Sequence, residues 1–301
     1  MNEAAQRRRA LALLAVLALV WGTNWPLFPL VMREMSVWTF RAVTMMVTVA
    51  VLMSVARLRG QSLALPREYW PALAAAALCN LAVWNIASAY AAILIPSGQA
   101  AILGFTMPLW AALIAWLMWR EPLSARMYLA LAIGAAGVGL LIWRGAEAYA
   151  QAPLGATCGL VAAIGWAAGT LVLKRTRLNG SGLPTTVLAA WQMAIAAVPI
   201  VAVAAWQFFS EGGRVNLPSA TTLWVTAYIA LVPMCLGNVV WFSIVGLLPA
   251  HVAGLGSVAV PMVAMLSGAL VHGEPLGPVQ IVAMACSMGA LALALPRRGA
   301  G

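Results

Sequence analysis

The chain has 301 residues, of which 64% are hydrophobic and 8% charged, and its formal net charge is +10. Soluble globular proteins carry about 25% charged residues, so this composition excludes that class and predicts an integral membrane protein. The basic residues stand in short clusters between long apolar runs, which does not favour nucleic acid as a partner. Such clusters are instead typical of loops that stay in the cytoplasm.

Apolar runs of about 17–25 residues, the length that crosses a bilayer, follow one another along the chain. We expect ten spans, at residues 10–32, 36–56, 69–92, 96–118, 126–143, 154–174, 185–207, 221–245, 249–271 and 277–296. Lipid offers the backbone no hydrogen-bond partner, so each span should be an α-helix. The fold class is therefore an all-α integral membrane protein, with the lipid bilayer as its surroundings.

The first apolar run also has features of a signal peptide. Three arginines, Arg7, Arg8 and Arg9, precede it, but Trp21–Pro26 stands where a small-residue cleavage site would be expected. We therefore expect this run to be retained as a span.

Basic residues predict the orientation of the chain. With a cytoplasmic N-terminus, thirteen of the 17 basic residues fall on the inside, three fall outside, and Arg41 lies within a span. This asymmetry, together with an even number of spans, predicts that both termini are cytoplasmic. A bacterial-type inner (plasma) membrane is the expected location.

The chain also contains an internal repeat. The tripeptide Glu-Pro-Leu begins at Glu121 and again at Glu274, 153 positions later. The same offset aligns Asn85 with Asn238 and Pro108 with Pro261, in spans of matching rank. Such an ordered set indicates duplication. We expect two five-helix repeats, residues 1–148 and 149–301, which together form one membrane domain.

An odd number of spans per repeat places the two repeats in opposite orientations. A 5+5 inverted-topology repeat around a central cavity is typical of secondary transporters. Each Glu-Pro-Leu turn then lies at a different face of the membrane. A turn that ends a helix is one interpretation of each motif, and gating is the other, with Glu121, Pro122, Glu274 and Pro275 as the gating residues.

With these features the chain resembles the drug/metabolite transporter superfamily, in its EamA-type ten-helix branch. The resemblance rests on Trp21-Gly22, on the Pro-containing fourth and ninth spans that precede the two Glu-Pro-Leu turns, and on the Gly-rich fifth span. It implies a central substrate cavity and the export of amino acids or other small metabolites. Among its members, the chain is most similar to the amino-acid exporters, including those for aromatic amino acids. The second half has Trp166-Ala167 in place of Trp-Gly, so the two halves need not contribute equally to the site.

Polar and tryptophan side chains deep in the spans are the candidates for substrate binding, because polar groups in the membrane usually face a cavity. We expect the binding residues to be Trp21, Asn24, Asn85, Ser88, Gln99, Thr106, Trp166, Asn238, Trp241 and Ser257. Core packing is the alternative for each mid-span tryptophan, and hydrogen bonding to a neighbouring helix is the alternative for Asn85 and Asn238.

Three further residues have two interpretations each. Arg41 is expected to extend its charged end to water, with contact to a substrate carboxylate as the alternative. Pro108 and Pro261 lie inside their spans and are expected to bend them. These bends are either static or hinges that close the cavity.

The chemistry of these residues favours a carrier. Tryptophan, methionine and neutral amides suit an amphipathic small molecule, and a bare phosphate would require deep basic groups. The chain has no Asp and no Gly-rich phosphate loop, and His251 and His272 lack partners at metal spacing. We therefore expect no enzyme, no cofactor and no metal; a channel and a scaffold or receptor are further alternatives.

The seven Glu residues all fall at termini or in loops. No carboxylate is placed to carry a proton across the membrane, which favours facilitated diffusion by alternating access. A proton-coupled drug or metabolite exporter is the alternative. We expect a monomer or a weak homodimer.

Overall fold

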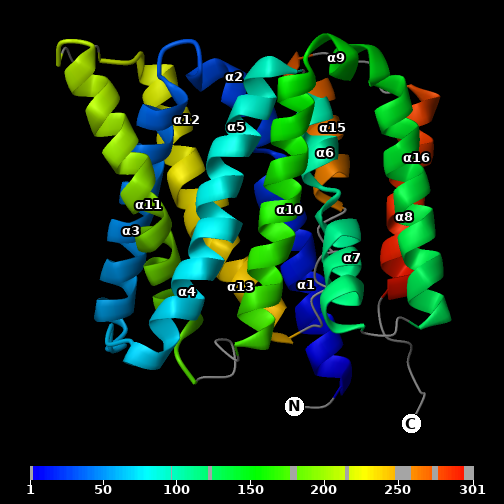
Figure 1. Ribbon diagram of the computed structural model, residues 1–301, viewed down its shortest axis with the longest axis horizontal. Helices are drawn as coiled ribbons and strands as arrows, with labels where there is room; N and C mark the ends of the chain where they lie inside the picture. The colour runs from blue at the N-terminus through cyan, green and yellow to red at the C-terminus, as the bar shows by residue number, and fades with distance from the viewer. Residues whose placement is uncertain are drawn as a thin grey trace.

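The computed structural model describes residues 3–95, 97–120, 124–176, 182–213, 217–247, 259–272 and 277–294. Every regular element in these ranges is a helix, and the long helices form one bundle (Figure 1).

The first half of the chain supplies the helices on which most of the cavity described below is built. Its elements are α1 (Glu3–Gly22), η1 (Trp25–Leu27), α2 (Phe28–Val31), α3 (Val37–Leu58), η2 (Arg67–Tyr69), α4 (Trp70–Ala77), η3 (Leu78–Val83), α5 (Trp84–Leu94), α6 (Ser97–Gly104), α7 (Met107–Trp119), α8 (Ala125–Arg144) and α9 (Ala146–Gln151).

The second half has a similar succession of elements. They are α10 (Pro153–Arg175), α11 (Thr185–Ser210), α12 (Ala220–Ile229), η5 (Ala230–Leu236), α13 (Gly237–Leu247), α15 (Ala259–His272) and α16 (Pro278–Ala294).

Serine side chains begin several of the long helices. The Ser36 hydroxyl accepts a hydrogen bond from the Thr39 N–H at 3.1 Å, at the start of α3. Ser124 does the same for the N–H of Met127 at 3.2 Å, at the start of α8. Such caps supply partners for N–H groups that have none within the helix.

Eight helical stretches are long and apolar enough to cross a membrane. They are Arg8–Val31, Val37–Leu58, Arg67–Leu94, Gln99–Trp119, Ala125–Arg144, Pro153–Arg175, Thr185–Ser210 and Ala220–Leu247. The ninth and tenth predicted spans correspond to shorter apolar helices in the described residues, Ala259–Val271 and Ile281–Ala290. The helical fold of the spans therefore agrees with the prediction, and the count of ten stays a prediction.

Several spans are interrupted, which the sequence did not predict. The first changes to a 3-10 turn at Trp25–Leu27, and the fourth breaks between α6 and α7. The third and eighth each contain a π-helical stretch, Leu78–Val83 and Ala230–Leu236. Such stretches are frequent at functional sites.

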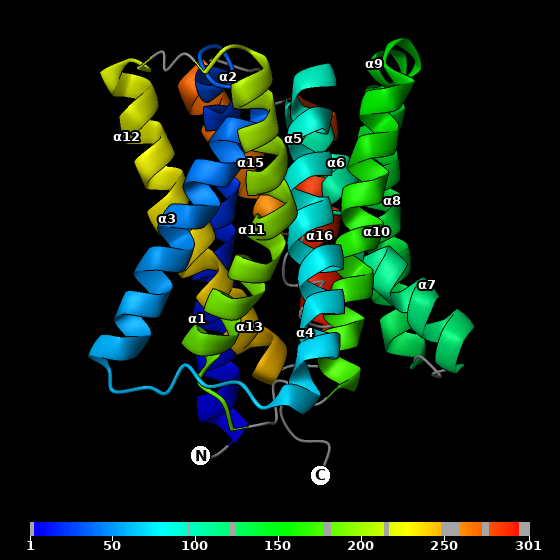
Figure 2. The ribbon, with the colours of Figure 1, turned by 60° about the vertical axis from the view of Figure 1, so that its left-hand side comes forward.

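The most extensive helix contacts join the two halves of the chain. α8 packs along α16, α3 along α11, α5 along α10, and α1 along α15. Figures 1 and 2 show these neighbours in one bundle, with the start of α1 and the end of α16 at the same end. α7 lies at this end too, and α15 lies at the opposite end (Figure 1).

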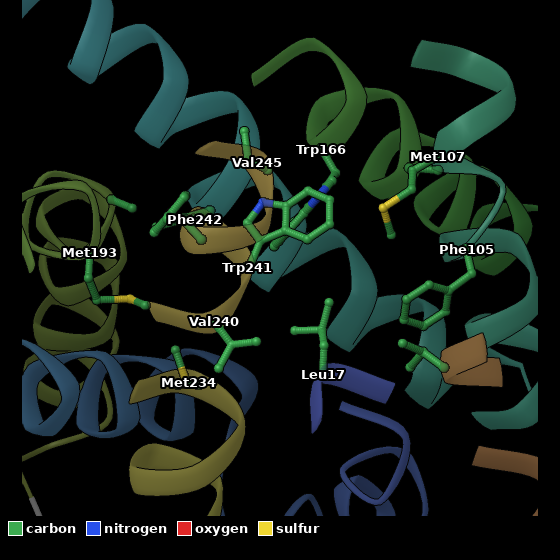
Figure 3. Close-up of a cluster of buried hydrophobic side chains, with 14 of the residues drawn as sticks. Leu17, Phe105, Met107, Trp166, Met193, Met234, Val240, Trp241, Phe242 and Val245 are labelled. Carbon is green, nitrogen blue, oxygen red and sulfur yellow. The ribbon is translucent and has the colours of Figure 1, made fainter. Parts of the chain in front are cut away.

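Tryptophans divide into an exposed set and a buried set. Trp143, Trp206 and Trp224 near the span ends are 71–77% exposed, as expected for residues at a membrane interface. In contrast, Trp166 is 3% exposed and Trp241 is fully buried. Figure 3 shows these two indoles in the hydrophobic core beside Leu17. The mid-span tryptophans thus lie inside the bundle.

Candidate functional site

A cavity of about 50 Å³ lies between helices of both halves. Its walls come from α1 to α3 and η3 to α5, from the break after α6, and from α10, η5 and α13. The lining residues are Trp21, Asn24, Trp25, Phe28, Arg41, Leu81, Trp84, Asn85, Ser88, Phe105, Trp166, Pro233, Met234 and Asn238.

Trp166 lies at the centre of one group of aromatic rings. Its ring centroid is 5.0 Å from that of Trp84, 5.2 Å from that of Trp21 and 5.5 Å from that of Trp241. The Trp21 ring meets it edge-on, at an interplanar angle of 90°. Edge-to-face pairs stabilise beyond their buried area, so these rings form a stable wall.

A second group of rings extends this wall towards α3. Trp25 lies 6.4 Å from Trp84, 6.0 Å from Phe105 and 5.7 Å from Phe28, measured between ring centroids. The rings therefore form a connected series from Phe28 to Trp166.

The main chain of η5 holds the Trp21 indole in place. Its Nε1 donates a hydrogen bond to the Pro233 carbonyl at 3.0 Å. The ring fits because residue 237 is glycine. A Cβ atom there would lie closer to the Trp21 Nε1 atom than real contacts allow.

Asn85 and Asn238 occupy equivalent places beside the two π-helical stretches. The Nδ2 of Asn85 donates to the Leu81 carbonyl at 2.8 Å, and that of Asn238 donates to the Met234 carbonyl at 2.7 Å. Both acceptors belong to the residue's own helix, so neither of these two bonds joins one helix to another.

Asn80 has the helix-joining role instead. Its Nδ2 donates to the Trp166 carbonyl and to the Thr170 hydroxyl, each at 3.1 Å. This amide links η3 to α10 and fixes the backbone at Trp166.

The prediction that the charged end of Arg41 extends to water is wrong. The residue is 2% exposed and lines the cavity. Its Nε donates to the Asn85 carbonyl at 3.0 Å, and its guanidinium carbon lies 4.7 Å from the Phe28 ring centroid. The side chain turns inward because these groups lie on the inner side of α3.

Four polar atoms on the lining residues have no hydrogen-bond partner within the described part of the chain. They are Asn24 Oδ1, Ser88 Oγ, Trp166 Nε1 and Asn238 Oδ1. Buried polar groups are normally paired, so these atoms are available to a bound molecule. They include both donors and acceptors, which suits a polar headgroup on an otherwise apolar compound.

Comparison with known proteins identifies the family of the chain. The profile of the EamA-like transporter family matches residues 8–143 and again residues 153–295. The chain belongs to the EamA-like transporter family. The two matches fall on the two halves in which the sequence repeat was found.

Individual relatives agree with the family. The chain is 26% identical over 276 residues to the uncharacterized transporter YvbV of Bacillus subtilis, covering 92% of this chain and 88% of that one. It is 28% identical over 221 residues to the protein PecM of Dickeya dadantii, covering 70% and 69% of the two chains. A crystal structure at 19% identity matches the fold with a TM-score of 0.73, covering 95% of this chain and 96% of the other.

In this EamA-like transporter, the cavity brings together six of the residues that the sequence singled out. They are Trp21, Asn24, Asn85, Ser88, Trp166 and Asn238. Trp241 does not line the cavity and lies behind it, with its ring centroid 5.7 Å from that of Trp21.

Two predicted residues lie elsewhere, and a third lies outside the described residues. A Cβ at Gly145 would lie 2.9 Å from the Gln99 side chain, which places Gln99 against the corner before α9. The Thr106 hydroxyl donates to the Leu103 carbonyl at 2.6 Å and accepts from the Trp110 indole, so it is satisfied locally. Ser257 is not among the described residues.

The predicted hinge residues have a different setting from the expected one. Pro108 stands in the first turn of α7, after the break in the fourth span, and Pro261 is the third residue of α15. Proline is tolerated there because the first helical N–H groups lack partners within the helix. The predicted gating residues at the two Glu-Pro-Leu turns, Glu121, Pro122, Glu274 and Pro275, lie outside the described residues.

Sequence reasoning missed part of the aromatic wall. Trp25, Phe28 and Phe105 line the cavity but were not predicted. The spacing of Trp21 and Trp25, four residues apart, was an available signal, since such residues share a helix face. Of the two π-helical stretches, Ala230–Leu236 contains Pro233, which signals a disturbed helix, whereas Leu78–Val83 has no such residue.

Proposed function

We propose that this protein exports small amphipathic metabolites, foremost amino acids and aromatic ones among them, by alternating access. The observation that carries the proposal is the cavity between the halves, where indole rings adjoin neutral polar groups. An apolar wall with a few polar atoms suits a compound with an apolar body and a hydrogen-bonding head. The resemblance to amino-acid exporters points to the same substrate class.

A 5+5 inverted repeat of ten helices is part of this proposal. Two family matches, the cross-half helix pairs and the two π-helical stretches support it. So do the places of α7 and α15 at opposite ends of the bundle (Figure 1). In such repeats, the halves rock about a central site and open it alternately to each side.

The size of the cavity supports a moving carrier. Its volume of about 50 Å³ is well below the ~300–1,000 Å³ of typical ligand sites. An amino acid would therefore enter only after the halves separate. The two π-helical stretches and the break before Pro108 lie beside the cavity, where such a movement would bend the spans.

Orientation and energy source complete the proposal. The end of the bundle at which α1 begins faces the cytoplasm of a bacterial-type inner membrane, because most basic residues belong to that end. No carboxylate lines the cavity among the described residues. Export then follows the substrate's own gradient, through a monomer or a weak homodimer.

Counterflow in liposomes tests this function. Purified protein is reconstituted in vesicles loaded with unlabelled L-phenylalanine, and labelled L-phenylalanine is added outside. A carrier gives saturable uptake, and the labelled substrate inside transiently exceeds its equilibrium level. This happens because unlabelled internal substrate speeds the return of the carrier to its outward-facing state. Uptake that is linear in concentration and indifferent to internal substrate would indicate a channel and contradict the proposal.

A further inference from the structure

Arg41 is a buried charge within a membrane span. It lies on α3, which belongs to the span Val37–Leu58, and only 2% of it is exposed. An isolated charge in the membrane interior is costly, so intramembrane ionisable residues usually have a partner or a function. The identity of the partner is therefore the question that this residue raises.

Within the described part of the chain, few of the N–H donors of the guanidinium have a hydrogen-bond partner. A guanidinium has five N–H donors, and within the described residues one hydrogen bond satisfies it, from Nε to the Asn85 carbonyl at 3.0 Å. Phe28 and Phe40 lie against the guanidinium, with ring centroids 4.7 Å and 5.2 Å from its carbon. Rings stabilise a cation through their faces but leave its remaining donors unpaired.

No carboxylate in the described residues pairs with this charge. The acidic residues whose side chains are described, Glu34, Glu68, Glu147 and Glu211, are all exposed. The nearest in sequence, Glu34, accepts hydrogen bonds from the Ser219 N–H and hydroxyl instead. Within the described residues, this buried positive charge therefore has no anionic partner.

The guanidinium faces the same cavity as the aromatic wall. Arg41 packs on Phe28, whose ring is linked through Trp25 and Trp84 to Trp166. A molecule with an anion at Arg41 would place its apolar body along these rings. The unpaired Asn24 Oδ1, which accepts hydrogen bonds, is available to an ammonium group of the same molecule.

We propose that Arg41 binds the carboxylate of the transported substrate and thereby selects carboxylates over amines of the same shape. This inference rests on the proposed function. It adds a charge rule to the site, namely that a ligand with a carboxylate binds more tightly than an amine of the same shape. A guanidinium pairs with a carboxylate through charge-assisted hydrogen bonds, about twice as strong as neutral ones. An amine without a carboxylate would bring a second positive charge against Arg41.

Binding measurements on detergent-purified full-length protein test this rule. Four phenyl compounds serve as probes: L-phenylalanine, 3-phenylpropionate, L-phenylalaninamide and phenethylamine. Dissociation constants are measured by calorimetry for wild type, Arg41→Gln and Arg41→Lys. Arg57→Gln is the matched control, because Arg57 is an exposed arginine in the last turn of the same helix.

We expect the wild type and Arg57→Gln to bind the two carboxylates at least about tenfold more tightly than the amide and the amine. In Arg41→Gln this ratio should fall to within about twofold, since the amide side chain lacks the charge. Arg41→Lys should keep the preference for carboxylates.

Two other outcomes overturn different claims. Equal affinity of the wild type for carboxylates and amines, or an unchanged ratio in Arg41→Gln, overturns the inference and leaves the transporter standing. Failure of the wild type to bind any of the four probes overturns the proposed substrate class, and the charge rule with it. If Arg41→Gln does not fold, the inference stays falsifiable, because equal affinity of the wild type for carboxylates and amines overturns it without any variant.

Discussion

Asn85 and Asn238, 153 residues apart, make the same hydrogen bond. Each side-chain amide donates to the carbonyl four residues earlier, at 2.8 Å to Leu81 and 2.7 Å to Met234. Each follows a π-helical stretch and lines the cavity. The two halves thus present equivalent amides to one space.

Replacing Asn238 should impair transport more than stability. Asn238→Leu keeps the branched shape of the side chain and removes the unpaired Oδ1 from the cavity, so we expect counterflow of L-phenylalanine to fall at least about tenfold. Ser243→Ala is the control, because the Ser243 hydroxyl bonds to the Val239 carbonyl of the same helix and does not line the cavity. Equal effects of the two changes on counterflow would contradict a binding role for Asn238.

Gly237→Ala tests the close approach of α13 to Trp21. The new Cβ would clash with the indole Nε1 and would displace the ring from the Pro233 carbonyl. We expect a lower melting temperature and a loss of counterflow. Gly246→Ala in the same helix meets nothing within 4 Å, and should be neutral or stabilise by up to about 1 kcal/mol, since Ala favours helix more than Gly.

Trp166→Ala should be among the most damaging tryptophan changes. The side chain is 3% exposed and touches the rings of Trp21, Trp84 and Trp241. Removing a buried aromatic costs about 3–5 kcal/mol, measured as the free energy of unfolding in detergent. Trp206→Ala, at a residue 71% exposed, should change stability by about 0.5 kcal/mol or less. A Trp166→Phe variant keeps a ring, and should fold while transporting more slowly.

Glu34 gives the stability a dependence on pH. Hydrogen bonds from the Ser219 N–H and then its hydroxyl lower the pKa of this carboxyl below 4.5. A lowered pKa means that the carboxylate stabilises the fold above its unfolded pKa, and that this contribution is lost as the pH falls through the lowered value.

The corresponding measurement compares melting temperatures of the wild type and Glu34→Gln. The variant should melt lower at pH 7, and the difference should shrink as the pH falls through the lowered pKa of Glu34 and vanish once the wild-type carboxyl is protonated. Glu211→Gln, an exposed carboxyl at the end of α11, serves as the control. A difference that persists unchanged at low pH would show that the Ser219 contact contributes nothing through its charge.

The sequence predicted the spans and the repeat for simple physical reasons. A bilayer demands long apolar helices, and a duplication leaves matched residues such as Asn85 and Asn238 at one offset. Depth within a span also separated the buried Trp166 from the exposed Trp206. These features depend on the position of each residue along the chain, which can be read directly from the sequence.

The remaining features depend on the direction in which each side chain points from its helix and on the groups that it contacts. The position of a residue along the chain determines neither of these. Arg41 points inward because Phe28, Phe40 and the Asn85 carbonyl lie on that side of α3. Gln99 was predicted to line the cavity from its depth in the fourth span, but it packs against Gly145. The break after α6 separates Gln99 from Thr106, so the two residues do not lie on one continuous helix.

The central claim is that the protein is an uncoupled carrier with no proton-carrying group in its cavity. Gradient-driven uptake tests this claim most directly. Liposomes with the purified protein take up labelled L-phenylalanine with no gradient, with an imposed pH gradient, and with an imposed membrane potential. We expect the internal concentration to reach the external one and to stop there in all three conditions. Accumulation above the external concentration under either gradient would contradict the account and favour the proton-coupled alternative.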